Sequence, residues 1–172
     1  MAHWADSFDL ATLRLSSGEA ASVDLTVPVE PLELAGQRYA AAGGGAELRL
    51  DVSRTTGAGY ALRLRYGVAL EGPCMRCLER ACTELEIDAR EVDQPDDEAD
   101  ELRSPYLHDD ELDLRAWTRD ALALALPTQI VCRDDCRGLC PVCGVGLNAD
   151  PGHGHQPEPD PRWAKLSELK LD

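Results

Sequence analysis

The stretch YALRLRYGVAL, residues 60–70, alternates large apolar side chains with polar or small ones over its whole length. Because successive side chains of a β-strand point to opposite faces of the sheet, this period of two predicts a strand with one buried face. It is the clearest such pattern in the chain. It places one set of side chains in the predicted core: Tyr60, Leu62, Leu64, Tyr66, Val68 and Leu70.

The segments on either side of residues 60–70 repeat the same periodicity. Residues 47–52 (ELRLDV) and 84–90 (ELEIDAR) alternate charged and apolar side chains. The run that contains Gly57 and Gly59 is typical of a hairpin connection, and a short link joins the second strand to the third. Three consecutive strands with short links predict an antiparallel meander.

The N-terminal segment 1–40 carries a weaker pattern. Residues 23–27 (VDLTV) alternate, and prolines follow at positions 28 and 31, where they interrupt ladder hydrogen bonding. We therefore expect an N-terminal strand and loop region of one or two edge strands, ahead of an α+β core at residues 41–128.

An amphipathic helix is predicted between Asp113, a suitable N-cap, and Pro127, which cannot continue a helix. The apolar residues recur at helical spacing, so this face is expected to pack on the sheet and to complete an α+β fold. The residues predicted on that face are Leu114, Trp117, Ala121, Leu124 and Ala125, widened by Leu122 and Leu126.

Acidic residues dominate the segment 91–112, which has few apolar side chains to bury and is expected to be a mobile excursion from the core. The whole chain carries 32 acidic and 17 basic residues, a formal net charge of −15. This charge disfavours broad contact with phosphate backbones and favours a basic protein as partner, although solubility alone also explains it.

No run of the sequence reaches the roughly 18 apolar residues that a membrane-spanning helix needs. Residues 1–15 carry Asp6, Asp9 and Arg14 among their apolar residues. We therefore expect no secretion and no membrane insertion, and a cytoplasmic location. In a reducing compartment, seven cysteines at short spacings indicate metal ligands before disulfides.

The cysteines fall into two groups. The first knuckle, Cys74 and Cys77, lies between two predicted strands, whereas a redox Cys-x-x-Cys pair prefers a strand-to-helix junction. A denser group follows the helix and ends in the second knuckle, Cys140 and Cys143. It also contains Cys132 and Cys136, and two imidazoles follow it, His153 and His155.

Eight candidate ligands could fill one or two structural zinc sites in a Cys/His-rich tail at residues 129–172, and two pairings remain open. In one pairing, the first knuckle joins Cys132 and Cys136, while the second knuckle joins the two histidines. In the other, the two knuckles close a single zinc ribbon and the remaining groups are spare. A closed site would stabilise the fold without catalysing a reaction.

The other reactive side chains have ordinary explanations. Cys82 is expected to be a small buried thiol, and His3 and His108 are expected to be solvated. We find no nucleophile with a base and no phosphate-binding Gly-rich loop, so no enzymatic activity is expected. A short C-terminal helix is predicted from Asp160 and Pro161, with Trp163, Leu166 and Leu169 on its apolar face.

Four motifs together resemble the YceD-like family. They are GPCMRCL at 72–78, the helix region 112–127, CRDDCRGLCPVCGVGLN at 132–148 and DPRWAKL at 160–166. The resemblance runs from about residue 46 to the C-terminus. It implies a bacterial or plastid-type factor that supports accumulation of large-subunit ribosomal RNA in ribosome assembly, without enzymatic activity.

Members of this family often end the second cysteine group with Cys-x-Cys, where this chain has His153 and His155. Imidazole and thiolate both suit zinc, so the change preserves the ligand chemistry. The first knuckle is the part of the site that the resemblance supports most directly.

The expected function is therefore binding. The acidic protein would hold a basic ribosomal protein or assembly factor, and its effect on ribosomal RNA would be indirect. Two alternatives remain. The first is a thiol oxidoreductase that uses the first knuckle. The second is a zinc-ribbon regulator that contacts nucleic acid through arginines near the metal, which are Arg76, Arg80, Arg133 and Arg137.

Overall fold

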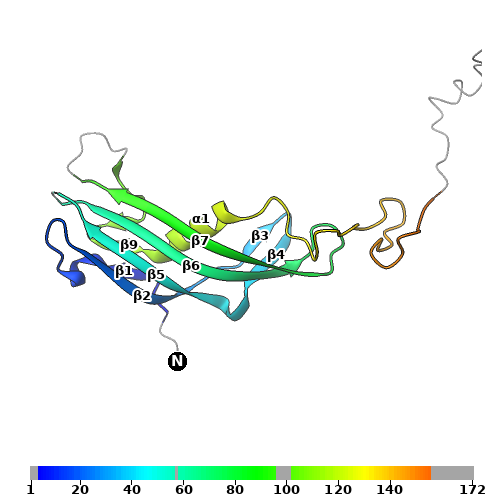
Figure 1. Ribbon diagram of the computed structural model, residues 1–172, viewed down its shortest axis with the longest axis horizontal. Helices are drawn as coiled ribbons and strands as arrows, with labels where there is room; N and C mark the ends of the chain where they lie inside the picture. The colour runs from blue at the N-terminus through cyan, green and yellow to red at the C-terminus, as the bar shows by residue number, and fades with distance from the viewer. Residues whose placement is uncertain (1–3, 57, 96–101, 156–172) are drawn as a thin grey trace, which may run out of the picture.

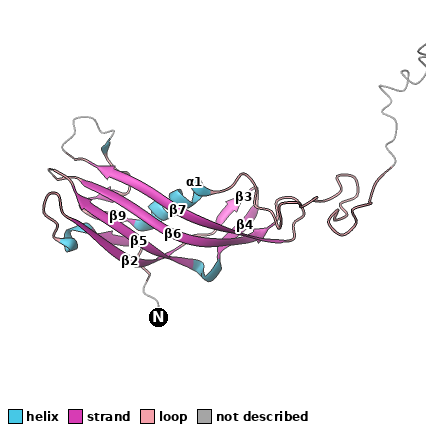
Figure 2. Ribbon diagram, in the orientation of Figure 1, coloured by secondary structure: helices cyan, strands magenta, loops and turns pink. Residues whose placement is uncertain are grey.

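The computed structural model describes residues 4–56, 58–95 and 102–155. It shows a long, twisted antiparallel sheet with one α-helix across one face (Figure 1). Figure 2 shows how strongly strands outweigh helix in this arrangement. The strands are β1 Ser7–Asp9, β2 Ala20–Pro28, β3 Leu32–Leu34, β4 Gln37–Ala41, β5 Gly45–Arg54, β6 Tyr60–Pro73, β7 Arg80–Asp93, β8 Leu107–His108 and β9 Glu111–Asp113, and the helix is α1 Leu114–Ala125.

Strand β6 is the centre of the main sheet. It pairs with β7 along its whole length, and its other side pairs first with β5 and then, near its end, with β4. All of these pairs are antiparallel, so the predicted meander of three strands is confirmed as β5, β6 and β7. The α+β fold class is also confirmed.

The period of two in β6 and β5 produces the core. Leu64 is fully buried and lies between Leu50 of β5 and Ala89 of β7 in the register of the sheet. Each predicted core residue of β6 is at most 7% exposed. The hydrophobic effect therefore fixes the register, because a slip of one residue would turn this whole set toward water.

Helix α1 begins where the sequence predicts. The Asp113 side chain accepts a hydrogen bond from the Ala116 N–H at 2.8 Å, and the helix ends at Ala125, before Pro127. Trp117 and Leu122 are buried, but the prediction for Leu124 is wrong, because this side chain is 90% exposed. Leu124 lies at the border of the buried face, beside the edge of β7, where no further strand among the described residues covers it.

The structure does not separate residues 1–40 from the core. Strand β2 pairs with β5 along its whole length, and β4 crosses the expected boundary to pair with β6. Pro28 is tolerated because it lies at the end of β2, on an edge strand. The N-terminal segment therefore supplies strands to the main sheet.

The acidic segment also differs from the prediction at both of its described ends. Strand β7 continues to Asp93. Residues 107–113 contain β8 and β9, and β9 pairs with both β8 and β1 in a small second sheet. Asp93 is buried and accepts hydrogen bonds from the Ser104 N–H at 3.0 Å and from Arg103 Nε at 3.1 Å. These bonds offset the cost of burying its charge.

Two further predictions, His3 and the short helix with Trp163, Leu166 and Leu169, lie outside the described residues. Across residues 4–56, 58–95 and 102–155, no helix has both the length and the apolar character that crossing a membrane requires.

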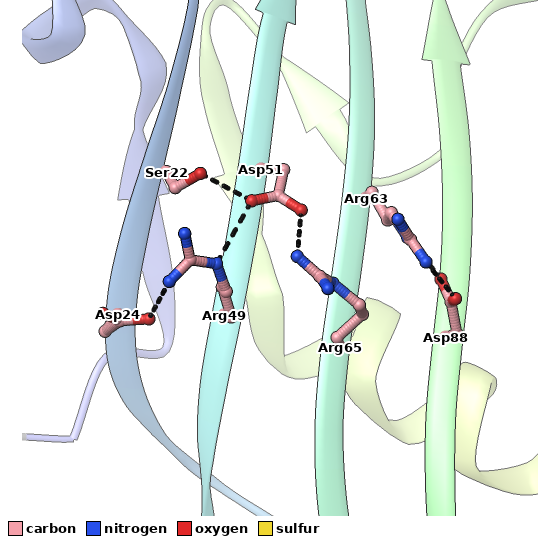
Figure 3. A network of polar contacts seen from close by, with 7 residues as sticks. All are labelled: Ser22, Asp24, Arg49, Asp51, Arg63, Arg65 and Asp88. Atoms are coloured by element: carbon pink, nitrogen blue, oxygen red, sulfur yellow. Dashed lines mark hydrogen bonds and ion pairs between the residues drawn. The ribbon is translucent and has the colours of Figure 1, made fainter.

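Charged side chains form a ladder across the solvent face of the sheet (Figure 3). Arg65 contacts Asp51 at 2.6 Å, Arg49 lies 3.5 Å from both Asp51 and Asp24, and Arg63 binds Asp88 on β7. Hydrogen bonds from Ser22 and Arg65 lower the pKa of Asp51 despite the opposing effect of its partial burial. Exposed pairs of this kind contribute about 0.2–1 kcal/mol each, so the ladder supports the register more than the total stability.

Replacing Leu50 with alanine tests the position of the core. This side chain is fully buried on β5, so Leu50→Ala is expected to lower the free energy of unfolding by about 2–5 kcal/mol in urea denaturation. Leu124→Ala is the matched control and is expected to change it by less than about 0.5 kcal/mol. Equal losses in the two variants would contradict the assigned faces of the sheet and helix.

Candidate metal centres

The first knuckle is the tight connection between β6 and β7. The Cys74 N–H donates to the Glu79 carbonyl at 2.6 Å, and the Leu78 N–H donates to the Cys74 carbonyl at 3.0 Å. Leu78 has a φ of +64°, the left-handed conformation that allows the chain to turn back. This turn places Cys74 and Cys77 on the inner side of the connection, where both are buried.

The second knuckle has the same hydrogen-bond pattern. The Cys140 N–H donates to the Val145 carbonyl at 2.8 Å, and the Gly144 N–H donates to the Cys140 carbonyl at 2.8 Å. Gly144 has a φ of +74°, in the position where the first knuckle has Leu78. A single bridge between Leu139 and Gly146 closes this small hairpin. The two knuckles therefore present their thiols in the same way.

The first candidate centre combines the first knuckle with Cys132 and Cys136. Its four sulfur atoms lie within 4.8 Å of one another, with Cys74 Sγ 3.8 Å from Cys136 Sγ and Cys77 Sγ 3.6 Å from Cys132 Sγ. In a tetrahedral zinc site with Zn–S bonds of about 2.3 Å, two sulfur atoms are about 3.8 Å apart. The four thiols thus fit a single tetrahedral ion.

The second candidate centre combines the second knuckle with His153 and His155. Cys143 Sγ lies 3.1 Å from His153 Nε2 and 3.2 Å from His155 Nε2, and the two Nε2 atoms are 3.0 Å apart. Ideal tetrahedral zinc geometry gives about 3.5 Å between sulfur and nitrogen and about 3.3 Å between two nitrogens. A relaxation of a few tenths of an ångström would admit the ion.

The structure therefore assembles the first of the two pairings that the spacing left open. The two knuckles are not brought together in one four-sulfur ribbon; each has its own pair of partners. All eight predicted ligands belong to one group or the other, and their ability to hold metal ions follows from this geometry. The identity of the ion stays a prediction.

Contacts around the first knuckle explain how a segment beyond the helix reaches it. The Met75 N–H donates to the Ile130 carbonyl at 2.8 Å, and Ile130 is buried beside the thiols. Arg76 donates to the Gln129 side chain at 3.0 Å and to the Cys136 carbonyl at 3.1 Å. Figure 1 shows this segment passing the end of β6 and β7 and continuing away from the sheet.

One thiol in each centre has a strongly lowered pKa, whereas burial raises the pKa of Cys77 and Cys132 in the first centre. Burial raises the pKa of Cys74, but backbone N–H groups of Arg76 and the neighbouring cysteines outweigh it and lower the pKa to about 6. Backbone N–H groups of Cys143 and Val142 lower the pKa of Cys140 to about 6. Each centre therefore offers a thiolate near neutral pH, the form that ligates metal.

Asn148 joins the two centres, a role that the sequence does not predict. Its Nδ2 donates to Cys136 Sγ at 3.4 Å, and its Oδ1 accepts a hydrogen bond from the Arg137 N–H at 2.8 Å. Asn148 lies in the chain between the second knuckle and His153, so its amide ties the loop of one centre to a sulfur of the other. No local spacing pattern identifies such a donor.

The remaining cysteine and histidine of interest lie apart from the centres. The prediction for Cys82 is wrong, because its side chain is exposed; the alternation of β7 turns Ala81 inward and Cys82 outward. His108 is exposed, as expected.

The arginines near the first centre make contacts within the chain. Arg80 pairs with Glu71 at 2.7 Å and Arg133 with Asp135 at 3.2 Å. Arg137 donates to the Pro151 carbonyl at 3.2 Å. Together with the contacts of Arg76, these interactions reduce the charge and the number of donors that a phosphate backbone would meet.

Comparison with known proteins gives one family match. The family model described as large ribosomal RNA subunit accumulation protein YceD matches residues 62–170. Uncharacterized proteins of Mycobacterium bovis and Mycobacterium tuberculosis are 42% identical to this chain over 103 residues, covering 57% of this chain and 49% of each relative. The chain thus spans about half the length of these curated relatives. No solved structure matches the chain.

Replacing Asn148 tests the link between the centres. Asn148→Ala removes a donor to a thiolate ligand, so we expect the metal affinity of the first centre to fall by about 10–100-fold. Competition with a chromophoric chelator measures this affinity. Gln129→Ala, which removes a contact to Arg76 but none to sulfur, is the control and should leave the affinity within about threefold of the wild type. Equal affinities in the two variants would exclude the role assigned to Asn148.

Proposed function

This chain belongs to the family of the large ribosomal RNA subunit accumulation protein YceD, and we propose that it supports accumulation of that RNA as a non-enzymatic assembly factor of the cytoplasm. The family match carries the proposal. It covers residues 62–170, which include both knuckles, all eight candidate ligands and the helix that packs on the sheet.

We further propose that both centres bind zinc and that the zinc is structural. Four cysteines, or two cysteines and two histidines, form the ligand sets that zinc prefers, and four protein ligands leave no position for a substrate. When bound, zinc would stabilise the folded state by linking segments that are distant in the sequence. In the first centre the linked segments are the end of the β6–β7 hairpin and the chain that follows α1.

A protein partner agrees better with the charges than a nucleic acid does. The chain carries a net charge of −15, and the arginines of the solvent face that Figure 3 shows are paired with aspartates. The four arginines near the first centre also make contacts within the chain, which weakens the case for a zinc-ribbon regulator of nucleic acid. The proposed partner is therefore a basic ribosomal protein or assembly factor, and the effect on ribosomal RNA is indirect.

A role as thiol oxidoreductase agrees less well with the position of the first knuckle. The lowered pKa of Cys74 would suit a nucleophile, but its side chain is 0% exposed and lies among three other thiols. A redox thiol must meet the disulfide of its substrate. Burial among four sulfurs suits a metal ligand instead.

Depletion of the protein in its own organism tests the proposed function. The ratio of large-subunit to small-subunit ribosomal RNA is expected to fall, and wild-type protein should restore it. Cys132→Ser should fail to restore the ratio, because the first centre loses a ligand. Cys82→Ser is the matched control, since Cys82 is exposed and belongs to neither centre.

A ratio that stays unchanged on depletion would reject the role in ribosomal RNA accumulation. If the ratio falls but the protein crosslinks to ribosomal RNA without any protein partner, the RNA role survives and the protein-binding mechanism is rejected.

A further inference from the structure

Strand β7 forms an open edge of the main sheet. Among the described residues it pairs with β6 and with no other strand, from Arg80 to Asp93. A long unpaired edge is a template for another strand, and proteins normally cover or interrupt such edges. An edge of this length is therefore expected to be covered by another segment or by a partner.

The hydrogen-bond register shows which backbone groups face the open side. Cys74 and Glu79 form a hydrogen-bonded pair just beyond the last pair of the ladder, and such pairs alternate along antiparallel strands. The odd-numbered residues of β7 therefore bond to β6, and the even-numbered residues point N–H and C=O outward. Gln94 continues this outward set, and its N–H donates to the Leu102 carbonyl at 2.8 Å, which agrees with the assigned register.

A groove of about 490 Å³ runs beside the open edge, between β7 and the last turns of α1. Figure 1 shows the helix and this strand side by side. The wall of the groove is part polar and part apolar, and Leu124, at its border, is 90% exposed. The apolar lining residues are Ile87, Ala89, Trp117, Ala121, Leu124 and Ala125. A strand added to β7 would cover the exposed Leu124 and the partly exposed Ala89 and Ala125 with half of its own side chains.

The rim of the groove is acidic. Glu86, Asp88 and Glu91 line it, against a single base, Arg90. Asp88 is paired with Arg63, but no ion pair within the described chain includes Glu86 or Glu91.

A second copy of this chain would not satisfy the same edge. At the centre of β7, the side chains on the solvent face of the sheet are Glu84, Glu86 and Asp88. Two copies paired antiparallel through this edge would therefore place carboxylates opposite carboxylates. The net charge of −15 adds long-range repulsion between copies. Charge complementarity instead favours a basic occupant.

We propose that the open edge of β7 and the groove beside α1 bind an extended segment of a basic protein, in which lysine or arginine alternates with apolar residues. The segment adds to the sheet as a strand next to β7. Its apolar side chains pack against Leu124 and the helix, and its cations face Glu84 and Glu86 on the other side. This proposal rests on the proposed function, because it assigns the binding site for the basic partner.

A synthetic probe tests the proposal on the full chain. The probe is a capped, fluorescently labelled octapeptide of alternating valine and lysine, and fluorescence anisotropy measures its Kd at physiological salt. Binding is expected, with a Kd at least about 10-fold lower than that of an alternating valine–glutamate peptide. Absence of binding, or equal binding of the two peptides, would overturn the docking site.

Two matched pairs of variants separate strand addition from general attraction between charges. Glu86→Pro removes an outward N–H and leaves the β6 ladder intact, while Glu86→Ala removes the same charge and keeps the N–H. The Kd of the proline variant is expected to exceed that of the alanine variant by about 10-fold. Leu124→Lys should also raise the Kd about 10-fold, whereas Ala11→Lys, which adds the same charge at an exposed position in the short helical turn Leu10–Leu13, should not. Equal values within either pair would overturn the proposal.

Hydrogen exchange gives an independent readout. On binding, the amides of Glu84, Glu86 and Asp88 should become protected, while the odd-numbered amides of β7 are protected already. If the even-numbered amides are protected in the full chain without peptide, the edge is covered from within and the proposal is overturned. These binding measurements are independent of the ribosomal RNA ratio measured on depletion, so failure of the docking site is distinguishable from failure of the proposed function.

Discussion

The antiparallel pairing of β6 with β7 determines where the other parts of the molecule lie. It runs without interruption from Tyr60 and Asp93 to Pro73 and Arg80. Helix α1 packs on the inner face of this pair of strands, and β5 and β4 pair with the other edge of β6. Its closed end holds the first knuckle at the end of the sheet. Burial of one face fixes this register, because any slip by one residue would expose the core.

The same hairpin connects the two features on which the proposed function depends. At its closed end, Cys74 and Cys77 meet the segment that follows α1, so a metal ion held by the first candidate centre would link the helix to the sheet. Along its side, β7 has no second strand partner among the described residues and lies next to a groove that Leu124 borders and that has an acidic rim. A metal bound at the end would thus hold α1 against the strand whose edge is proposed to receive a partner.

Local sequence patterns predicted the strands and the helix of this fold but not the contacts between them. The alternation of residues 60–70 and the cap at Asp113 are short-range signals, and both are confirmed. The predictions for Cys82 and Leu124 were wrong, because the exposure of each side chain depends on which faces of β7 and α1 are covered by other elements. The choice between the two ligand pairings depends on contacts such as that of Met75 with Ile130, which no spacing of cysteines encodes.

Native mass spectrometry of the full chain, purified without chelator, tests the two separate centres most directly. We predict two zinc ions per chain in the wild type. Cys74→Ser should lose one ion and Cys140→Ser the other, while Cys82→Ser should keep both, since Cys82 is exposed and outside both clusters. A single zinc that is lost in both ligand variants would indicate one ribbon closed by the two knuckles and would contradict the account, as would a chain that binds no metal.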